Sequence, residues 1–167
     1  LFTHDELYDA WLKTNAWWYI NYGPSPLNGA VQPYSQRLLL RRIITEADSC
    51  VALSHPGATL RYGHDTMVMP LVCLLGIDGY DKEVEDLERL DDENWLDYRI
   101  FPMACNLQFV FYRSQKRPHD ILVKVLLNEN EAMLPFPSAI APYYHWQDFK
   151  AYYLAKIDNF QVRGCQK

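Results

Sequence analysis

The stretch Gly57–Gly76, which reads GATLRYGHDTMVMPLVCLLG, carries the local pattern that decides the predicted fold. Residues 58–62 are β-like, Gly63 indicates a turn, and the apolar run that follows predicts a helix over about residues 66–75. A strand that is followed directly by a helix is typical of folds in which helices pack on a sheet. We therefore expect an α/β or α+β fold in which helices pack on a sheet. In it, this strand–turn–helix unit places a His-Asp dipeptide at the N-terminus of the helix.

The His64-Asp65 dipeptide falls at this predicted helix N-terminus. Backbone N–H groups at such an end are unpaired and lie at the positive end of the helix dipole, which makes an anion site. Gly63 allows the turn and a close approach of a ligand to the backbone. His64 can donate to a phosphate oxygen, and Asp65 can transfer a proton to a leaving oxygen if a nearby anion keeps it protonated. The spacing alone favours the simpler explanation, in which Asp65 is an N-cap, as Asp often is.

Arg61 allows two interpretations. Strand alternation places Thr59, Arg61 and Gly63 on one face and Leu60 and Tyr62 on the other. An arginine just before the turn can reach a phosphate with two hydrogen bonds, or it can pair with a carboxylate of the acidic stretch that follows the helix. The sequence leaves both open.

Two further His-Asp pairs have sufficient structural explanations. His4-Asp5 falls in the first turn of a predicted helix, where an aspartate interacts favourably with the helix dipole. His119-Asp120 follows Pro118 in a predicted loop, where it precedes a strand. We expect neither pair to be catalytic.

The remaining elements follow from periodicity and turn residues. We expect one compact unit made of a helical segment, residues 1–56, and an α/β portion, residues 57–167. We also expect the acidic stretch 78–95 to be a solvated surface excursion. The predicted elements are a helix over 3–23 with a Thr3–Glu6 capping box, a helix over 34–53, strands within 103–114 and 120–131 joined by a hairpin loop at 115–119, and a helix over 143–157. The predicted core is Leu60, Tyr62, Met69, Leu71, Leu74, Phe109, Phe111, Val123 and Val125.

Composition excludes several classes of protein. The 167 residues suffice for one domain with a core, and a net charge of −5 with scattered Lys and Arg argues against a nucleic-acid surface. The longest apolar run, Met67–Ile77, is too short to span a bilayer. The chain begins at Leu1 without a signal-like leader, so we expect a processed or excised piece.

The cysteines and histidines show no ligand spacing. A metal-dependent phosphohydrolase built on a His-Asp pair would need further ligands converging from helices, and the sequence shows no such set. We therefore expect no metal and no cofactor. The residues concerned are Cys50, Cys73, Cys105 and Cys165, which contain no C-x-x-C, and His4, His55, His119 and His145.

The stretch LRYGHDTMVMPLVCLLG resembles the C-terminal signature of the histidine acid phosphatases, the second branch of the histidine phosphatase superfamily. It is most similar to the bacterial multiple inositol-polyphosphate phosphatase-like, or phytase-like, members. The resemblance is extended in the same order by FPMACNLQFVFYRS, ILVKVLLNENEAMLPFP and PYYHWQDFKAYYLAKI. It covers most of the chain from about Arg37 onward and, more loosely, the first helix. The resemblance implies the C-terminal part of a histidine phosphatase-like fold.

The resemblance also implies a mechanism. A histidine in an R-H-G-x-R-x-P motif attacks phosphorus and forms a phosphohistidine, and the acidic residue of the His-Asp pair protonates the leaving alcohol. His64 would then bind phosphate, Asp65 would be the general acid, and the Thr66 end of the helix would face the phosphate, with Arg61 as a further substrate-binding candidate. Inositol-phosphatase relatives often carry His-Ala-Glu here, so the His-Asp version leaves the substrate preference open.

The nucleophile motif R-H-G-x-R-x-P does not occur in the chain. We therefore expect the C-terminal part of a longer phosphomonoesterase, periplasmic or secreted by resemblance, whose partners are a phosphomonoester such as an inositol phosphate and the missing N-terminal part. The chain alone should be inactive, and an unpaired sheet edge would favour self-association. The alternative is a non-catalytic phosphate-binding or interaction module, a pseudo-phosphatase.

Overall fold

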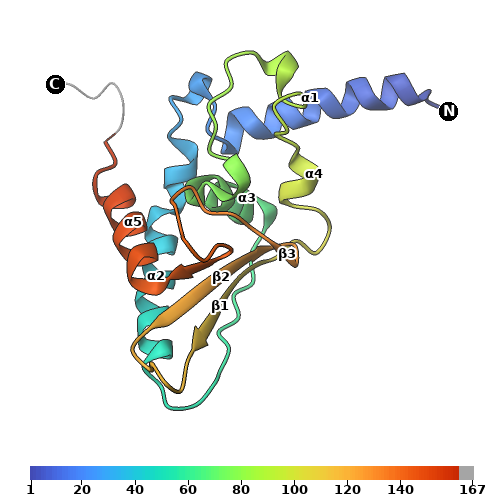
Figure 1. The fold of residues 1–167 in the computed structure, drawn as a ribbon. Coiled ribbons are helices and arrows are strands. Elements are labelled where there is room, and N and C mark those ends of the chain that lie inside the picture. The colour runs from blue at the N-terminus through green and yellow to red at the C-terminus, as the bar shows by residue number, and fades with distance from the viewer. Residues whose placement is uncertain (162–167) are drawn as a thin grey trace.

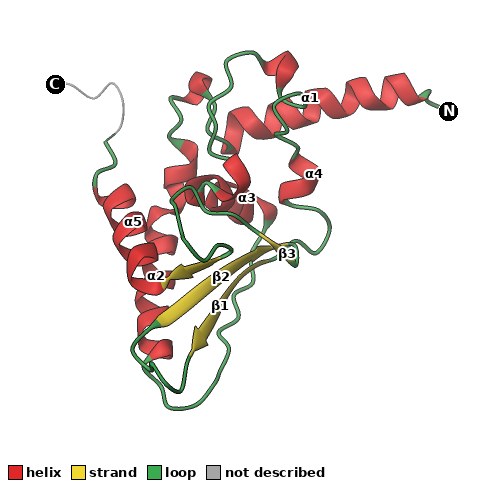
Figure 2. Ribbon diagram, viewed as in Figure 1, coloured by secondary structure: helices red, strands yellow, loops and turns green. Residues whose placement is uncertain are grey.

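The computed structural model describes residues 1–161 of the chain, so the predictions that concern residues 162–167, Cys165 included, lie outside the described residues. Within residues 1–161, five α-helices lie beside a small antiparallel sheet and beyond one end of it (Figures 1 and 2). The predicted mixture of helices and strands is confirmed. The elements in chain order are α1 (His4–Tyr22), η1 (Pro26–Asn28), η2 (Gln32–Gln36), α2 (Arg37–Val51), α3 (Asp65–Leu75), η3 (Ile77–Gly79), η4 (Leu87–Arg89), α4 (Asp97–Ile100), β1 (Leu107–Arg113), β2 (Ile121–Leu127), β3 (Asn130–Glu131), β4 (Tyr143–His145) and α5 (Trp146–Asp158).

The sheet is built around the predicted hairpin. Strands β1 and β2 pair antiparallel, in a register that runs from Leu107 opposite Leu127 to Arg113 opposite Ile121. The short strands β3 and β4 both pair with the other edge of β2. Among residues 1–161, no strand pairs with the outer edge of β1.

Aromatic contacts hold α5 on one face of this sheet. The rings of Phe109 and Phe149 meet edge to face at 5.8 Å, and those of Phe111 and Trp146 do so at 5.0 Å. Edge-to-face pairs of this kind contribute about 0.5–1.5 kcal/mol beyond the area that they bury. Helix α2 then joins α5 through Asp48, whose carboxylate accepts hydrogen bonds from the Trp146 indole at 2.7 Å and the Lys150 ammonium at 2.8 Å.

Helix α3 is the central helix of the fold (Figure 1). Every residue from Met69 to Leu75 is buried, as its almost unbroken apolar sequence requires. The helix ends at Gly76, whose φ of +66° lies in the left-handed region that glycine favours. A Cβ at this position would lie 2.6 Å from an Asp81 carboxylate oxygen, so glycine also makes room for the following turn.

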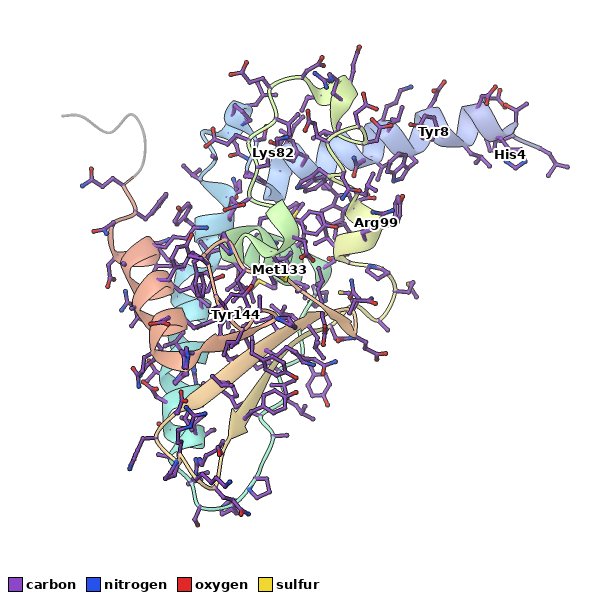
Figure 3. The ribbon with its side chains drawn as sticks, viewed as in Figure 1. His4, Tyr8, Lys82, Arg99, Met133 and Tyr144 are labelled. Atoms are coloured by element: carbon purple, nitrogen blue, oxygen red, sulfur yellow. The ribbon has the colours of Figure 1, made fainter. Side chains whose placement is uncertain are left out.

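Helix α1 begins with the predicted capping box between Thr3 and Glu6, and its first turn, with His4, projects beyond the rest of the fold (Figure 3). The Tyr8 hydroxyl donates to Asp91 of the acidic stretch. The second half of α1 also holds the acidic stretch in place. The buried Asn15 donates to the carbonyl of Trp95 at 2.9 Å and accepts from the Asp97 amide at 2.8 Å.

The prediction that the acidic stretch 78–95 is only a solvated excursion is therefore wrong. Its charged residues face water, but Val84, Leu90 and Trp95 are buried in the core. Apolar residues spaced too irregularly for a helix or strand still bury their side chains when a neighbouring helix offers a surface. Here that surface is α1.

The predicted strand over residues 58–62 is also corrected. These residues are not hydrogen-bonded to any described strand, and Leu60 and Tyr62 are 73% and 92% exposed instead of buried. The sequence has the alternation of a strand, but pairing requires a partner strand that residues 1–161 do not supply. Phe109 and Phe111 are half-buried. The rest of the predicted core, Met69, Leu71, Leu74, Val123 and Val125, is buried as expected.

Candidate functional site

The N-terminus of α3 lies where the sequence predicts it, one residue earlier than expected. His64 has extended backbone angles (φ −109°, ψ 165°) and occupies the N-cap position, and Asp65 is the first helical residue. Asp65 is therefore not the N-cap. The His64 carbonyl accepts the amides of Met67 at 2.9 Å and Val68 at 3.1 Å, which closes the first turn.

The side chains at this end are largely open to water. His64 and Asp65 are exposed and Thr66 is half-buried, and the His64 imidazole makes no capping hydrogen bond. One Asp65 carboxylate oxygen accepts the amide of Thr66 at 2.7 Å. Within residues 1–161, the Asp65 amide has no hydrogen-bond partner. An imidazole, a carboxyl group and a free helix-terminal amide therefore share one exposed surface.

Arg61 lies three residues before His64 and forms an ion pair with Glu46 of α2. Glu46 also accepts a hydrogen bond from Arg42 at 2.7 Å. That hydrogen bond is the main reason why the pKa of Glu46 lies below its usual value, and the charge of Arg61 acts in the same direction. Of the two interpretations of Arg61, the structure shows the carboxylate pair, with a partner on α2 and not in the acidic stretch.

The loop between α4 and β1 contains Cys105. Burial, and secondarily the negative charge of Asp65, raises the pKa of the Cys105 thiol. Ala104 has a φ of +60° and Met103 is 98% exposed. No chemical motif in the sequence singles out this loop.

The other His-Asp pairs lie elsewhere. His4 and Asp5 are exposed in the first turn of α1. Asp120 lies 2.8 Å from the Nδ1 atom of His145, beside a cavity of about 220 Å³ at the start of α5. The structure thus does not bring these residues to His64.

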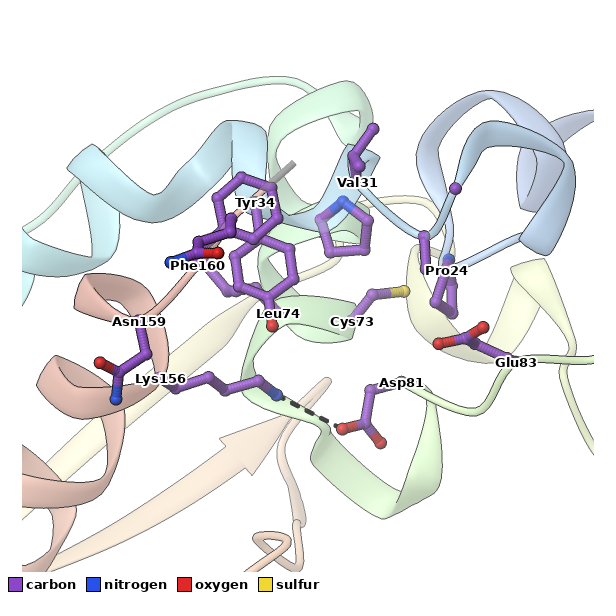
Figure 4. A pocket seen from close by; sticks show the side chains of 14 residues that line it. Pro24, Val31, Tyr34, Cys73, Leu74, Asp81, Glu83, Lys156, Asn159 and Phe160 are labelled. Carbon is purple, nitrogen blue, oxygen red and sulfur yellow. Dashed lines mark hydrogen bonds and ion pairs between the residues drawn. The ribbon is translucent and has the colours of Figure 1, made fainter. Parts of the chain in front are cut away.

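A larger cavity, of about 430 Å³, also lies apart from His64 and Asp65 (Figure 4). The ion pair of Asp81 with Lys156, 3.4 Å apart, lines it together with Glu83. The stacked rings of Tyr34 and Phe160 form another part of its wall. Two carboxylates against one ammonium make this cavity a poor site for a phosphate.

The described residues were also compared with the requirements of a metal site and of a membrane span. Within residues 1–161, no three His, Cys, Asp or Glu side chains lie in an arrangement that could hold a metal ion. None of the described helices combines the length and the apolar character needed to cross a membrane.

Comparison with known families assigns the chain to a protein superfamily. The family model described as histidine phosphatase superfamily (branch 2) matches residues 1–128. The chain belongs to this superfamily. The match confirms the family resemblance over residues 1–128, the first helix included.

Individual relatives are multiple inositol polyphosphate phosphatases. The chain is 28% identical over 127 residues to multiple inositol polyphosphate phosphatase 1 of Gallus gallus, across 72% of this chain and 27% of that protein. It is 24% identical over 109 residues to the enzyme of the same name from Dictyostelium discoideum, across 64% of this chain and 17% of that protein.

The fold is shared with a solved histidine phosphatase. The apo form of the Bifidobacterium longum multiple inositol polyphosphate phosphatase superposes with a TM-score of 0.68 at 23% identity, over 91% of this chain and 32% of that chain. Structures of that protein with inositol hexasulfate and with phosphate give TM-scores of 0.64 and 0.65. The chain therefore spans no more than about a third of the length of these relatives.

Proposed function

We propose that this chain is the C-terminal part of a phosphomonoesterase that acts through a phosphohistidine. His64 binds the phosphate and Asp65 is the general acid, while the nucleophilic histidine comes from residues outside the chain. The observation that carries this proposal is the exposed His64-Asp65 pair at the N-terminus of α3 in a member of the histidine phosphatase superfamily.

The chemistry follows from this geometry. The positive end of the α3 dipole and the free Asp65 amide favour an anion in front of the helix, and the His64 imidazole adds a donor. The second carboxyl oxygen of Asp65 makes no hydrogen bond within residues 1–161, so it is available to the leaving oxygen of a bound ester. Protonation of that oxygen lets an alcohol leave, and the same carboxylate then accepts a proton from the attacking water.

The proposed substrates are phosphomonoesters of the inositol phosphate class. The support is the name of both curated relatives and the inositol hexasulfate complex of the bacterial relative. Arg61 is a further substrate-binding candidate, although Glu46 holds it in the present structure. We place the longer enzyme in the periplasm or outside the cell, by resemblance.

The second candidate function is a non-catalytic phosphate-binding module. The absence of R-H-G-x-R-x-P from the 167 residues is compatible with both candidates. As a non-catalytic module, the His64 site would bind phosphate without turnover. The residues that precede Leu1 in the coding sequence distinguish the two candidates, because they either contain the nucleophile motif or do not.

The test compares two proteins on the same substrates. The 167-residue chain should hydrolyse neither nitrophenyl phosphate nor inositol hexakisphosphate, because it has no nucleophile. A longer polypeptide that carries this chain as its C-terminal part should hydrolyse both in the presence of a chelator. Activity of the 167-residue chain that persists through purification, or an inactive longer polypeptide, would contradict the proposal.

A further inference from the structure

The cavity of about 430 Å³ beside the C-terminal end of α3 holds more negative than positive charge (Figure 4). The charged groups among its described lining residues are the carboxylates of Asp81 and Glu83 and the ammonium of Lys156. The Cys73 thiol adds no charge, because burial, and secondarily the negative charge of Asp81, raises its pKa. The cavity is therefore electrostatically complementary to one further cation.

The uncharged part of the wall favours a guanidinium as that cation. The rings of Tyr34 and Phe160 stack with centroids 3.9 Å apart, and Val31 and Leu74 line the cavity beside them. A guanidinium is planar and more weakly hydrated than an ammonium, so it can lie against aromatic and apolar surface. It can also meet a carboxylate with two parallel hydrogen bonds. An arginine side chain therefore matches both parts of the wall.

The described chain leads directly to this cavity. Helix α5 ends at Asp158, and the next three residues, 159–161, all line the cavity. The ring of Phe160 stacks on Tyr34 of η2, so the chain is held against the cavity wall just beyond the helix. The segment that comes next in the sequence, residues 162–167, reads VRGCQK and contains two basic residues.

Connectivity distinguishes these two basic residues. Arg163 is two positions beyond Gln161 in the sequence. Because a chain spans at most about 3.6 Å per residue, the Cα atoms of these two residues lie within about 7 Å of each other. Lys167 is six positions beyond Gln161, and about 22 Å of chain allows it to lie clear of the cavity. The covalent chain thus keeps Arg163 at the cavity and does not keep Lys167 there.

We propose that the cavity is the docking site of residues 162–167, and that the Arg163 guanidinium pairs there with the Glu83 carboxylate. The occupant follows from the reach of Arg163 and from the charge of the cavity. The pair would lie beside that of Asp81 with Lys156 and would join the end of α5 to the chain after α3 a second time. The proposal does not depend on the proposed function, because the cavity lies apart from the N-terminus of α3.

A double-mutant cycle in the 167-residue chain tests the pair. Arg163→Gln should lower the midpoint of thermal unfolding by about 2 °C, the shift that a partly exposed ion pair produces in a chain of this size. Glu83→Gln should lower it by a similar amount. The double variant should unfold no lower than either single variant, because each substitution alone already removes the contact. A shift equal to the sum of the two single shifts, or no shift for Arg163→Gln, would overturn the proposal.

Lys167→Gln is the matched control. It removes the same charge from the same six-residue segment, but from a position that the chain does not keep at the cavity. The midpoint should be unchanged. A shift equal to that of Arg163→Gln would show that only the total charge of the segment matters, and would overturn the assignment of Arg163.

Hydrogen exchange at the end of α5 locates the effect. The Asn159 amide donates to the Ala155 carbonyl at 3.0 Å and so reports on the opening of the last turn of this helix. It should exchange about fivefold faster in Arg163→Gln than in the wild-type chain, because local opening no longer has to break the ion pair. Lys167→Gln should leave it unchanged. Equal exchange of the Asn159 amide in the wild-type chain and in Arg163→Gln would contradict docking of this segment at the cavity.

The same measurements identify the other occupants. Agmatine, an alkylguanidinium, is the probe for an external cation and should leave the midpoint of the wild-type chain unchanged. A midpoint that rises with agmatine would show that the cavity takes a cation from outside the chain. A wild-type midpoint that rises with protein concentration, while that of Arg163→Gln does not, would identify a second copy as the source of the guanidinium. Either result would overturn the proposal.

Discussion

At the scale of the residue, Asp48 illustrates how one carboxylate joins two helices. It lies on α2 and accepts hydrogen bonds from Trp146 and Lys150 of α5. Burial alone would raise its pKa, but the hydrogen bonds from Lys150 and Trp146 outweigh burial and lower the pKa below the usual value. A carboxyl group whose pKa is lower in the folded state stabilises the fold when it is ionised.

Asp48→Asn should therefore destabilise the chain by about 1 kcal/mol at pH 7, a modest value because solvent screens the pair. The loss should shrink as the pH falls through the lowered pKa, since the wild-type carboxyl group is then protonated as well. Urea unfolding at pH 7 and at pH 3 measures both values. Asp158→Asn, which removes the more exposed pair with Arg41, is the control and should cost less. A loss for Asp48→Asn that is unchanged at pH 3 would refute this role.

Single residues also mark the limit of prediction from sequence. His64 and Asp65 could be named because a His-Asp pair at a predicted helix start has a chemical meaning. Glu46 and Asn15 could not, because their contacts join residues that lie 15 and 80 positions apart. Nothing in the local pattern around Asn15 distinguishes it from other polar residues of α1.

At the scale of the element, periodicity predicted the helices and the hairpin, whose formation depends on residues close together in the sequence. The helices, the capping box and the β1–β2 hairpin follow from apolar spacing and turn residues, and the structure confirms them. The strand over residues 58–62 failed because β-structure is a property of pairs of segments. Its period was correct, as the contacts of Thr59 and Arg61 with α2 show.

The end of α3 gives a prediction at this scale. Gly76→Ala should destabilise the chain by about 2–3 kcal/mol, because the left-handed backbone costs about 1 kcal/mol for alanine and the new Cβ displaces the Asp81 carboxylate. Gly79→Ala is the matched control. Its φ of +83° is equally unfavourable, but a Cβ there meets no atom within 4 Å, so it should cost about 1 kcal/mol. Equal losses in chemical denaturation would show that contact with Asp81 is unimportant.

At the scale of the whole molecule, the chain combines a buried core with an open functional end. Helix α3 is enclosed by helices and sheet along its length, yet its N-terminus and residues 57–63 lie in water. The chain spans no more than about a third of its relatives. If it is part of a longer enzyme, as proposed, we expect the remainder to pack against this exposed surface. The residues that carry the proposed chemistry could be named from the sequence, but their exposure could not, because exposure depends on tertiary packing.

The central claim is that Asp65 is the general acid. It is tested most directly by how the loss of turnover in an Asp65 variant depends on the leaving group of the substrate. In the longer polypeptide, Asp65→Asn preserves the shape but removes the transferable proton. The alcohol that leaves from inositol hexakisphosphate is a poor leaving group, so turnover of this substrate should fall by about 10²–10⁴. Turnover of nitrophenyl phosphate should fall much less, because a nitrophenolate needs little protonation.

The matched control is Asp120→Asn, which alters the contact between Asp120 and His145 and should change neither rate. His64→Ala should weaken binding and turnover for both substrates, since it removes a phosphate donor. The decisive quantity is the ratio of the losses that Asp65→Asn causes on the two substrates, measured across acidic pH. A much larger loss for the inositol phosphate is the predicted result, and equal losses, or no loss at all, would contradict the assignment of Asp65 as the acid.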